Sequence, residues 1–294
     1  MLYDISLSLT YEYDHPVGGS RHQVRVMPRR DLPGQKVFRA ALTVEPAPAE
    51  TTVFTDFFGN DVTGFAYRAP HERLDVSVTA RLEILPASGP DAARSVPFAS
   101  LGAALSGAAT LAADSPHHFL GATAYTAASP GLRDWMAKSI APDCSVLAIA
   151  DALTKRLRDE FRYDGSATDV MTTAATAFKG KHGVCQDFSH VLIAGLRAAG
   201  IPAAYVSGCL RTEPPPGQER LQGADAMHAW VQVWTGPVTG WVGFDPTNGI
   251  RAGEDHIIFG IGRDYADVTP ILGRLKTSGE HAAGQSVDVV PVRP

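Results

Sequence analysis

The sequence predicts an α+β protein in which an antiparallel β part is followed by a part that mixes helices and strands. Residues 1–88 consist of short runs of alternating apolar residues, separated by Gly, Pro and Asn. Residues 96–163 are rich in Ala, which favours helices, and alternating runs return from residue 226. With 294 residues, of which 45% are hydrophobic, the chain is long enough for two domains with cores of their own. We therefore expect one domain at 1–90 and a second at 91–294.

The N-terminal part is expected to form an antiparallel β-sandwich, because several short strands with turns between them are typical of that fold. Phe-Gly-Asn-Asp at 58–61 is the clearest hairpin turn, and Pro86–Pro97 is the best candidate for a linker to the next domain. The expected strands are Tyr3–Tyr13, Arg21–Met27, Gln35–Glu45, Thr51–Phe58, Asp61–Arg68 and Arg73–Leu85.

The second part is expected to begin with helices and to end in a strand. Residues 96–163 form its helical portion, in which Ser145–Phe161 is the clearest helix. Residues 164–270 hold the segments that carry the chemistry. Residues 286–292 alternate again and are expected to return to a sheet as a terminal strand.

Cys185 stands at the start of a predicted helix. It lies in Gly-Val-Cys-Gln-Asp-Phe at 183–188, which leads into the apolar run Ser189–Gly200. A thiol in the first turn of a helix feels the positive end of the helix dipole and several unpaired backbone N–H groups, and both favour the thiolate. Cys185 is therefore the candidate nucleophile.

A candidate base and a candidate carboxylate follow on two strands of a hairpin. Ala226–Trp234 alternates as a strand that places His228 on one face, and Gly240–Asp245 is expected to form the next strand. If Gly-Pro at 236–237 is a two-residue turn, His228 lies directly opposite Asp245. A displacement by two residues would leave the pair diagonal on one face, whereas a displacement by one would send Asp245 to the other face.

The helix that begins at Cys185 is expected to point the thiol at this hairpin. His228 would then take the thiol proton and return it to the leaving amine, and Asp245 would fix the tautomer and orientation of the imidazole. The main-chain N–H of Cys185 is the candidate oxyanion donor. The predicted packed stripe of the helix consists of Cys185, Phe188, Leu192, Gly195 and Ala199.

Each of these residues also has a purely structural interpretation. A lone Cys at the start of an apolar helix is usually a small core residue, and a lone His on a strand is usually a satisfied polar side chain. Three suitable residue types in the order Cys, His, Asp, each in the local structure that it requires, favour a catalytic triad. For Cys144, in a Pro-Asp-Cys loop, and Cys209, at the end of an apolar strand, we favour the structural interpretation.

Four segments resemble the transglutaminase-like superfamily, the papain-like branch shared by tissue transglutaminases, peptide N-glycanases and many bacterial peptidases. They read GVCQDF at 183–188, LRAAGIPAAY at 196–205, HAW at 228–230 and WVGFDPTN at 241–248. GRDYADV at 262–268 and the β-rich N-terminal part are similar to a bacterial subgroup with an appended N-terminal β domain. The resemblance implies a papain-like core, in which a nucleophile helix packs on an antiparallel sheet, and maps the catalytic triad onto Cys185, His228 and Asp245.

Two aromatic residues are candidates for contact with a substrate. In some relatives a Trp or Gln side chain upstream of the Cys is a second oxyanion donor, and Tyr163 is the candidate for that position here. Trp230 shares the predicted face of His228 and Asp245, together with Trp241. The two tryptophans could roof a tunnel for an acyl acceptor or pack in the core, and packing is favoured.

Composition and motifs argue against several other classes. A net charge of −5 without a basic block gives no support to binding of nucleic acid or of anionic membranes. Three Cys without CxxC spacing, no apolar leader and no long apolar run favour a cytoplasmic protein. The ten His, His256 among them, show no metal-ligand spacing, and no GxxxxGK[ST] is present. The sequence therefore predicts neither a metal nor a cofactor.

The predicted function is that of a cysteine peptidase or amidase that acts on a peptide or protein amide through a thioester acyl-enzyme. Hydrolysis is the first choice because water is always available, whereas transfer needs a site that excludes water and admits an amine. The alternative is a protein-glutamine amine acyltransferase, a transglutaminase. A non-catalytic binding module is disfavoured because such a descendant need not keep all three triad residues. The substrate's identity and the oligomeric state stay open.

Overall fold

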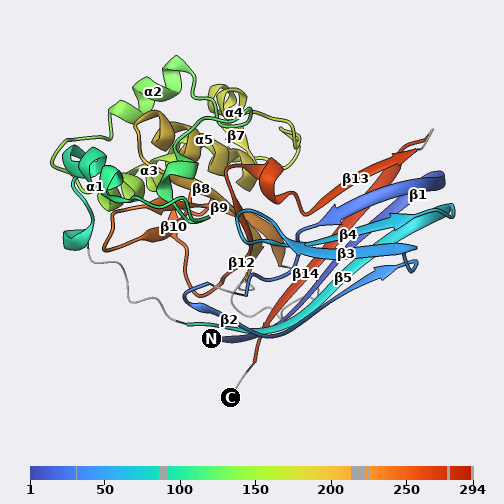
Figure 1. Ribbon diagram of the computed structural model, residues 1–294. Helices are drawn as coiled ribbons and strands as arrows, with labels where there is room; N and C mark the ends of the chain where they lie inside the picture. Colours follow the sequence, from blue (N-terminus) through green and yellow to red (C-terminus); the bar gives the residue numbers. More distant parts are fainter. Residues whose placement is uncertain (31, 86–91, 213–222, 224, 277–278, 293–294) are drawn as a thin grey trace, which may run out of the picture.

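The computed structural model describes residues 1–30, 32–85, 92–212, 223, 225–276 and 279–292. Its architecture is α+β, as the sequence predicts (Figure 1). Long antiparallel strands form one elongated half of the molecule, and helices gather on a smaller sheet in the other half. Half of the expected linker, residues 86–91, lies outside the described residues.

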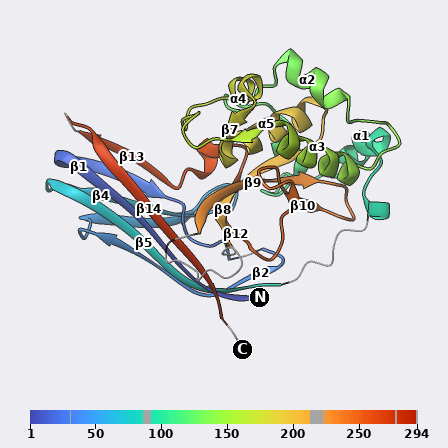
Figure 2. The same ribbon diagram turned by 180° about the vertical axis from the view of Figure 1, so that it is seen from behind.

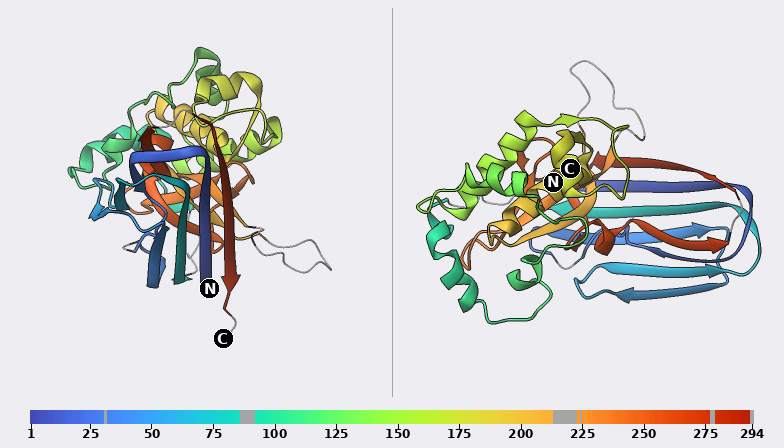
Figure 3. Two further views of the ribbon diagram at one scale, coloured as in Figure 1. Left: turned by 90° about the vertical axis from the view of Figure 1, so that its right-hand side faces the viewer. Right: turned by 90° about the horizontal axis from the view of Figure 1, so that it is seen from above.

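The N-terminal half is a seven-stranded antiparallel sheet built around one long bent strand, β1. Two strands were predicted where β1 is continuous, but its pairing with β5 breaks between Glu12 and Val17. The part before the break lies between β5 and β14, and the part after it lies between β4 and β13 (Figure 3). The strands are β1 (Leu2–Val24), β2 (Gln35–Glu45), β3 (Glu50–Thr55), β4 (Asp61–Tyr67), β5 (His71–Ile84), β13 (Ile271–Lys276) and β14 (His281–Pro291).

The C-terminal strand pairs with β1 over almost the whole of the first half of β1. The register runs from Tyr3 opposite Pro291 to Tyr13 opposite His281, and Figure 2 shows β14 along the length of the sheet. Val287 and Val289 of β14 are buried in the core of this half. The strand expected at 286–292 is therefore present, but it belongs to the N-terminal sheet and not to the remainder of 91–294. Its apolar face is buried there, and it covers an edge of β1 that would otherwise be open.

The helical portion contains the expected long helix but less α-helix elsewhere than predicted. Helix α3 begins after Ser145, whose hydroxyl accepts a hydrogen bond from the N–H of Ala148 at 3.2 Å. Residues 108–129 contain only a short 3₁₀ helix, Pro116–Phe119. The α-helices are α1 (Leu101–Gly107), α2 (Pro130–Ala137), α3 (Val146–Glu160), α4 (Ala174–Gly180) and α5 (Cys185–Ala198). Across the residues that the structure describes, none of the helices combines the length and apolarity that crossing a membrane requires.

Helix α5 packs on one face of a five-stranded antiparallel sheet. Ala229, Val231 and Val233 of β9 share a core with Phe188 and Leu192 of α5. The helix is buried around almost its whole circumference and not only along the predicted stripe. The strand order is β11 (Ile250–Arg251), β10 (Trp241–Asp245), β9 (Ala226–Trp234), β8 (Ala203–Leu210) and β12 (His256–Gly262). A short parallel pair, β6 (Arg162–Tyr163) and β7 (His182–Gly183), precedes α5.

Two glycines allow the segment that leads into β12 to lie close against the sheet. A Cβ at Gly243 would lie 2.7 Å from the Cβ of Ala252. A Cβ at Gly208 would lie 1.9 Å from the carbonyl oxygen of Ile257 and 2.7 Å from the ring of Trp230. Side chains at these positions would push the 252–257 segment away, so the glycines are needed for close approach and not for a turn.

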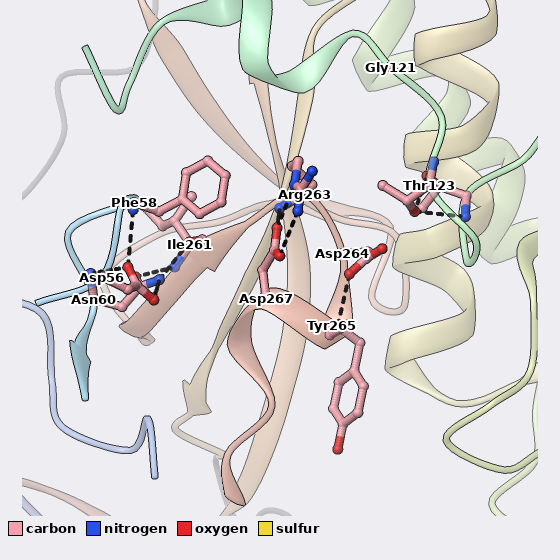
Figure 4. Close-up of polar contacts among 12 residues, drawn as sticks. Asp56, Phe58, Asn60, Gly121, Thr123, Ile261, Arg263, Asp264, Tyr265 and Asp267 are labelled. Carbon is pink, nitrogen blue, oxygen red and sulfur yellow. Dashed lines mark hydrogen bonds and ion pairs between the residues drawn. The ribbon is translucent and has the colours of Figure 1, made fainter. Parts of the chain in front are cut away.

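Side-chain amides of the N-terminal half bind the backbone of β12. Gln35 donates to the carbonyl of Ile258 and accepts from its N–H, both at 2.8 Å. Asn60 does the same with Ile261, at 2.9 and 2.8 Å (Figure 4). Both amides are buried, and each replaces a neighbouring strand as hydrogen-bond partner. The N-terminal sheet is thus fastened to a strand of the smaller sheet.

Candidate active site

Cys185 is the first residue of α5 and is partly exposed. The turn before it is fixed by Asp187, whose carboxylate accepts from the N–H of Val184 at 2.8 Å and from the hydroxyl of Thr168 at 2.6 Å. Gly183 leaves room for that carboxylate, since a Cβ there would lie 2.5 Å from Asp187 Oδ2. The sequence therefore presents the thiol at a helix N-terminus, in a defined turn.

His228 and Asp245 are hydrogen-bonded, with 2.9 Å between His228 Nε2 and Asp245 Oδ2. The strands pair Trp234 with Trp241, so the predicted register, with His228 directly opposite Asp245, is wrong by two residues. The displacement keeps both residues on one face, because side chains alternate with a period of two.

The turn between β9 and β10 explains the displacement. It spans 236–239 and is closed by a hydrogen bond from the N–H of Thr235 to the carbonyl of Gly240, at 2.9 Å. The hydroxyl of Thr235 is also within 2.7 Å of Thr239 Oγ1 and 3.1 Å of Gly240 O. Side-chain hydrogen bonds across the turn thus stabilise a longer connection than the two-residue turn that Gly-Pro suggested.

Asp245 is fully buried and accepts five hydrogen bonds. Its Oδ1 accepts from the N–H groups of Thr247 and Asn248, at 3.0 and 3.2 Å. Its Oδ2 accepts from His228, from His256 at 3.1 Å and from the side-chain amide of Asn248 at 2.7 Å. Burial by itself raises the pKa of the Asp245 carboxyl, but the bonds from the two imidazoles outweigh burial and hold that pKa well below its usual range.

The pKa of His228 is shifted in the opposite direction to that of Asp245. Burial lowers the pKa of its imidazole, but the hydrogen bond to Asp245 and the interaction with the Cys185 thiol outweigh burial and raise the pKa to about 10. Because Nε2 faces Asp245, Nδ1 is the nitrogen that can exchange a proton with the thiol. The arrangement can hold a charged imidazole between a thiol and a buried carboxylate.

His256 also belongs to this group, although the sequence predicts no site role for it. It is buried, and its Nδ1 accepts from the N–H of Gly253 at 3.1 Å, so its proton is on Nε2 and is donated to Asp245. No motif spacing marks it, because it comes from another strand. Alternation within β12, which begins at His256, could at most have indicated a buried position.

The ring nitrogens of His228 and His256 and a carboxylate oxygen of Asp245 lie within 4.8 Å of one another, a grouping that could hold a metal ion. A metal ligand must present a lone pair, however, and the Nε2 of His256 carries the proton that the Gly253 N–H forces onto it. The donor set therefore fits a hydrogen-bonded network better than a metal centre.

The two aromatic candidates lie in different surroundings. Tyr163 pairs with Gly183 through β6 and β7 and is 56% exposed; burial of its hydroxyl and the charge of nearby Cys185 raise its pKa. Trp230 is only 1% exposed. Its ring lies 6.1 Å from that of His228, nearly parallel, and 5.2 Å from that of His256, edge to face. Tyr163 is therefore exposed near the thiol, whereas Trp230 is buried and packs against both imidazoles.

The other two cysteines lie apart from this group. Cys209 is fully buried in the core of the N-terminal half, and burial raises the pKa of its thiol strongly. Cys144 is partly buried against the helical core, and its carbonyl accepts from the N–H of Phe98 at 2.9 Å. These positions agree with the structural interpretation of both residues.

Comparisons with known proteins cover both halves of the chain. Residues 3–83 match the bacterial transglutaminase-like N-terminal region, and residues 134–246, which include Cys185, His228 and Asp245, match the transglutaminase-like superfamily. An uncharacterised protein of Mycobacterium tuberculosis strain H37Rv is 34% identical over 304 residues, which cover 98% of this chain and 92% of the relative.

Two further matches bear on fold and family. A crystal structure from Cytophaga hutchinsonii, of a protein proposed to be a cysteine protease, superimposes with a TM-score of 0.75 at 20% identity, over 100% of this chain and 91% of that one. A protein-glutamine gamma-glutamyltransferase of Pseudomonas aeruginosa is 34% identical over 104 residues, which cover 33% of this chain and 15% of that protein.

Proposed function

Since the chain belongs to the transglutaminase-like superfamily and carries its bacterial N-terminal region, we propose that it is a cysteine enzyme that attacks an amide carbonyl with Cys185. The observation that carries the proposal is the contact between His228 and buried Asp245, which together with Cys185 raises the pKa of His228 to about 10. A base in this state keeps its proton near neutral pH and stabilises a thiolate beside it.

In the proposed mechanism the Cys185 sulfur adds to the carbonyl carbon of a peptide or protein amide. The oxyanion receives hydrogen bonds from the main-chain N–H of Cys185 and, in our proposal, from the hydroxyl of Tyr163. His228 then gives its proton to the leaving amine as the C–N bond breaks, and a thioester forms. For hydrolysis, His228 takes a proton from water, the hydroxide oxygen adds to the thioester carbonyl, and the sulfur leaves. Asp245 stays ionised throughout.

We propose that the thioester on Cys185 is hydrolysed by water. The burial of Trp230 supports it, because a packed indole does not roof a tunnel for an amine. Trp241 is partly buried and is held by contacts of its own: its indole N–H is donated to the carbonyl of Asp114 at 3.0 Å, and its ring lies 5.1 Å from that of Phe119. The acyl group on Cys185 is then open to water.

Amine transfer is the second candidate, and the partial match to the Pseudomonas gamma-glutamyltransferase favours it. A non-catalytic module stays disfavoured, because all three triad residue types are kept. We also propose a cytoplasmic location and a peptide or protein amide as the substrate.

The test of the nucleophile uses Cys185→Ala with Cys144→Ala as the matched control. Turnover of a peptide library should fall about a thousandfold or more in the first variant and stay unchanged in the second, since loss of a triad member removes most of the rate enhancement. Iodoacetamide at mildly acidic pH should label Cys185 before Cys144 or Cys209, by mass mapping. Faster labelling of either other cysteine would count against an activated Cys185.

Hydrolysis and transfer are separated by adding a large excess of a primary amine to enzyme and peptide. Mass spectrometry should then find mainly the free acid. An amide adduct that dominates at millimolar amine would replace the peptidase proposal with amine transfer and leave the proposed triad in place.

A further inference from the structure

His256 contacts Asp245 from a different strand than His228 does, β12 instead of β9. Both imidazoles donate to the same carboxylate oxygen, at 3.1 and 2.9 Å, and the rings lie 6.2 Å apart. The side chain of His256 is only 4% exposed, and that of Asp245 is not exposed at all. A charge-assisted hydrogen bond in such a place is stronger than one at the surface.

The direction of this hydrogen bond is set by the backbone. The N–H of Gly253 points at Nδ1 of His256, so the neutral imidazole must carry its proton on Nε2. With that tautomer His256 can only donate to Asp245. It therefore supports the ionised carboxylate and cannot itself remove a proton through Nε2.

The place of His256 is held from the N-terminal half. His256 is the first residue of β12, and two residues later Gln35 binds both the N–H and the carbonyl of Ile258. On the other side, the ring of Trp230 packs edge to face against His256. The donor is thus fixed by two elements that are distant from it in sequence, β2 and β9.

We propose that His256 is a positioning residue of the active site, which aims the Asp245 carboxylate at His228 and keeps it ionised. The inference rests on the proposed function. His256 donates to Asp245 and acts on His228 through that carboxylate. A carboxylate that receives this additional donor is a weaker base, so the proton that it shares with His228 stays on Nε2 of His228, and the proton on Nδ1 is the one that the leaving amine receives.

Two conservative variants separate this role from support of the turn at 253–256. In His256→Gln the side-chain amide nitrogen occupies about the position of Nε2, so it can still donate to Asp245 but offers little to the Gly253 N–H. In His256→Asn the side-chain oxygen can take the place of Nδ1, so the Gly253 bond is kept and the donor to Asp245 is lost. Each variant keeps one of the two hydrogen bonds.

We expect the Gln variant to retain the wild-type rate of Cys185 alkylation at pH 7 within about threefold, and the Asn variant to lose about tenfold or more. The latter is the loss typical of a hydrogen bond to a charged group. Turnover of an amide substrate should follow the same order. Equal loss in both variants, no loss in the Asn variant, or loss in the Gln variant alone would overturn the proposal.

A measurement on the unaltered protein does not depend on the folding of any variant. Nitrogen NMR of ¹⁵N-histidine-labelled protein should show the proton of His256 on Nε2, with Nδ1 as the acceptor. A proton on Nδ1 would overturn the proposal. This measurement needs neither turnover nor thiol reactivity, so it tests the hydrogen bond of His256 separately from the proposed function. A protein that does not cleave amides but carries the proton on Nε2 of His256 would refute the proposed function and leave the assigned hydrogen bond in place.

Discussion

Replacing Asp245 with Asn is expected to damage both the fold and the site, although the side chains have nearly the same shape. Both carboxylate oxygens of Asp245 accept hydrogen bonds: Oδ1 accepts from two backbone N–H groups, and Oδ2 accepts from three side-chain donors. An Asn amide has only one acceptor atom. In either orientation, its NH₂ group must face donors.

The less costly orientation places the Asn oxygen at Oδ2 and its NH₂ group against the N–H groups of Thr247 and Asn248. Two backbone donors, both in part-buried hydrogen bonds, then lose their acceptor. At about 1–3 kcal/mol for each unsatisfied buried group, the loss is about 2–6 kcal/mol, towards the lower end because Asn248 is exposed. From sequence alone we expect Asp245→Asn to impair activity less than His228→Ala does, because an amide can still accept from an imidazole. The five hydrogen bonds of Asp245 add a loss of stability to that expectation.

The pH dependence of stability should change in a defined direction. The pKa of Asp245 is lowered from 3.8, so the stability that its carboxylate contributes to the folded state is present above about pH 4 and is lost as the pH falls through the folded-state pKa. The pKa of His228 is raised from 6.5 to about 10, so its contribution is full below pH 6.5 and is lost as the pH rises towards 10. The gap between wild type and Asp245→Asn should therefore be largest between pH 4 and 6.5 and shrink towards pH 10.

Urea denaturation at pH 5.5, 7.5 and 9.5 measures this gap. The control is Asn248→Ala, which removes one of the three donors to Oδ2 and leaves both backbone donors paired, so a loss of about 1–2 kcal/mol is expected. An Asp245→Asn protein within about 0.5 kcal/mol of the wild type at pH 5.5, or a gap that grows towards pH 9.5, would refute the reasoning.

Two further predictions concern the junction between the halves. Gln35→Ala removes the acceptor of the Ile258 N–H, while the Ile258 carbonyl keeps a bond from the backbone N–H of Arg29. Thermal unfolding should show that the free energy of unfolding falls by about 1–3 kcal/mol. An unchanged Tm would contradict the role of this amide. Gly208→Ala places a methyl group 1.9 Å from a backbone oxygen of Ile257, so we expect the free energy of unfolding to fall by about 3 kcal/mol or more. The control is Gly102→Ala, which has nothing within 4 Å of its new methyl group and should be neutral or stabilising. Equal Tm shifts in the two variants would contradict the close packing.

Local patterns were enough to find the three residues of the proposed triad. The first turn of a helix, and the face of a strand, are set by residues three or four positions apart and by alternation, both of which are visible in the sequence. For that reason Cys185 lies at a helix start, and His228 and Asp245 share a face although their register was wrong by two residues. Alternation determines a face, but the length of a turn depends on hydrogen bonds such as those of Thr235, which composition does not reveal.

The same local patterns determined the α+β class and the strands of the N-terminal half. Only the tertiary structure decided that the C-terminal strand β14 joins β1, and that β1 bends to serve both parts of its sheet. It also decided that His256 reaches Asp245, which requires the 252–257 segment to lie against the sheet at Gly208 and Gly243. These features depend on which surfaces remain open once the elements have packed. That is a property of contacts between residues far apart in the chain, and no pattern within one segment of the sequence encodes it.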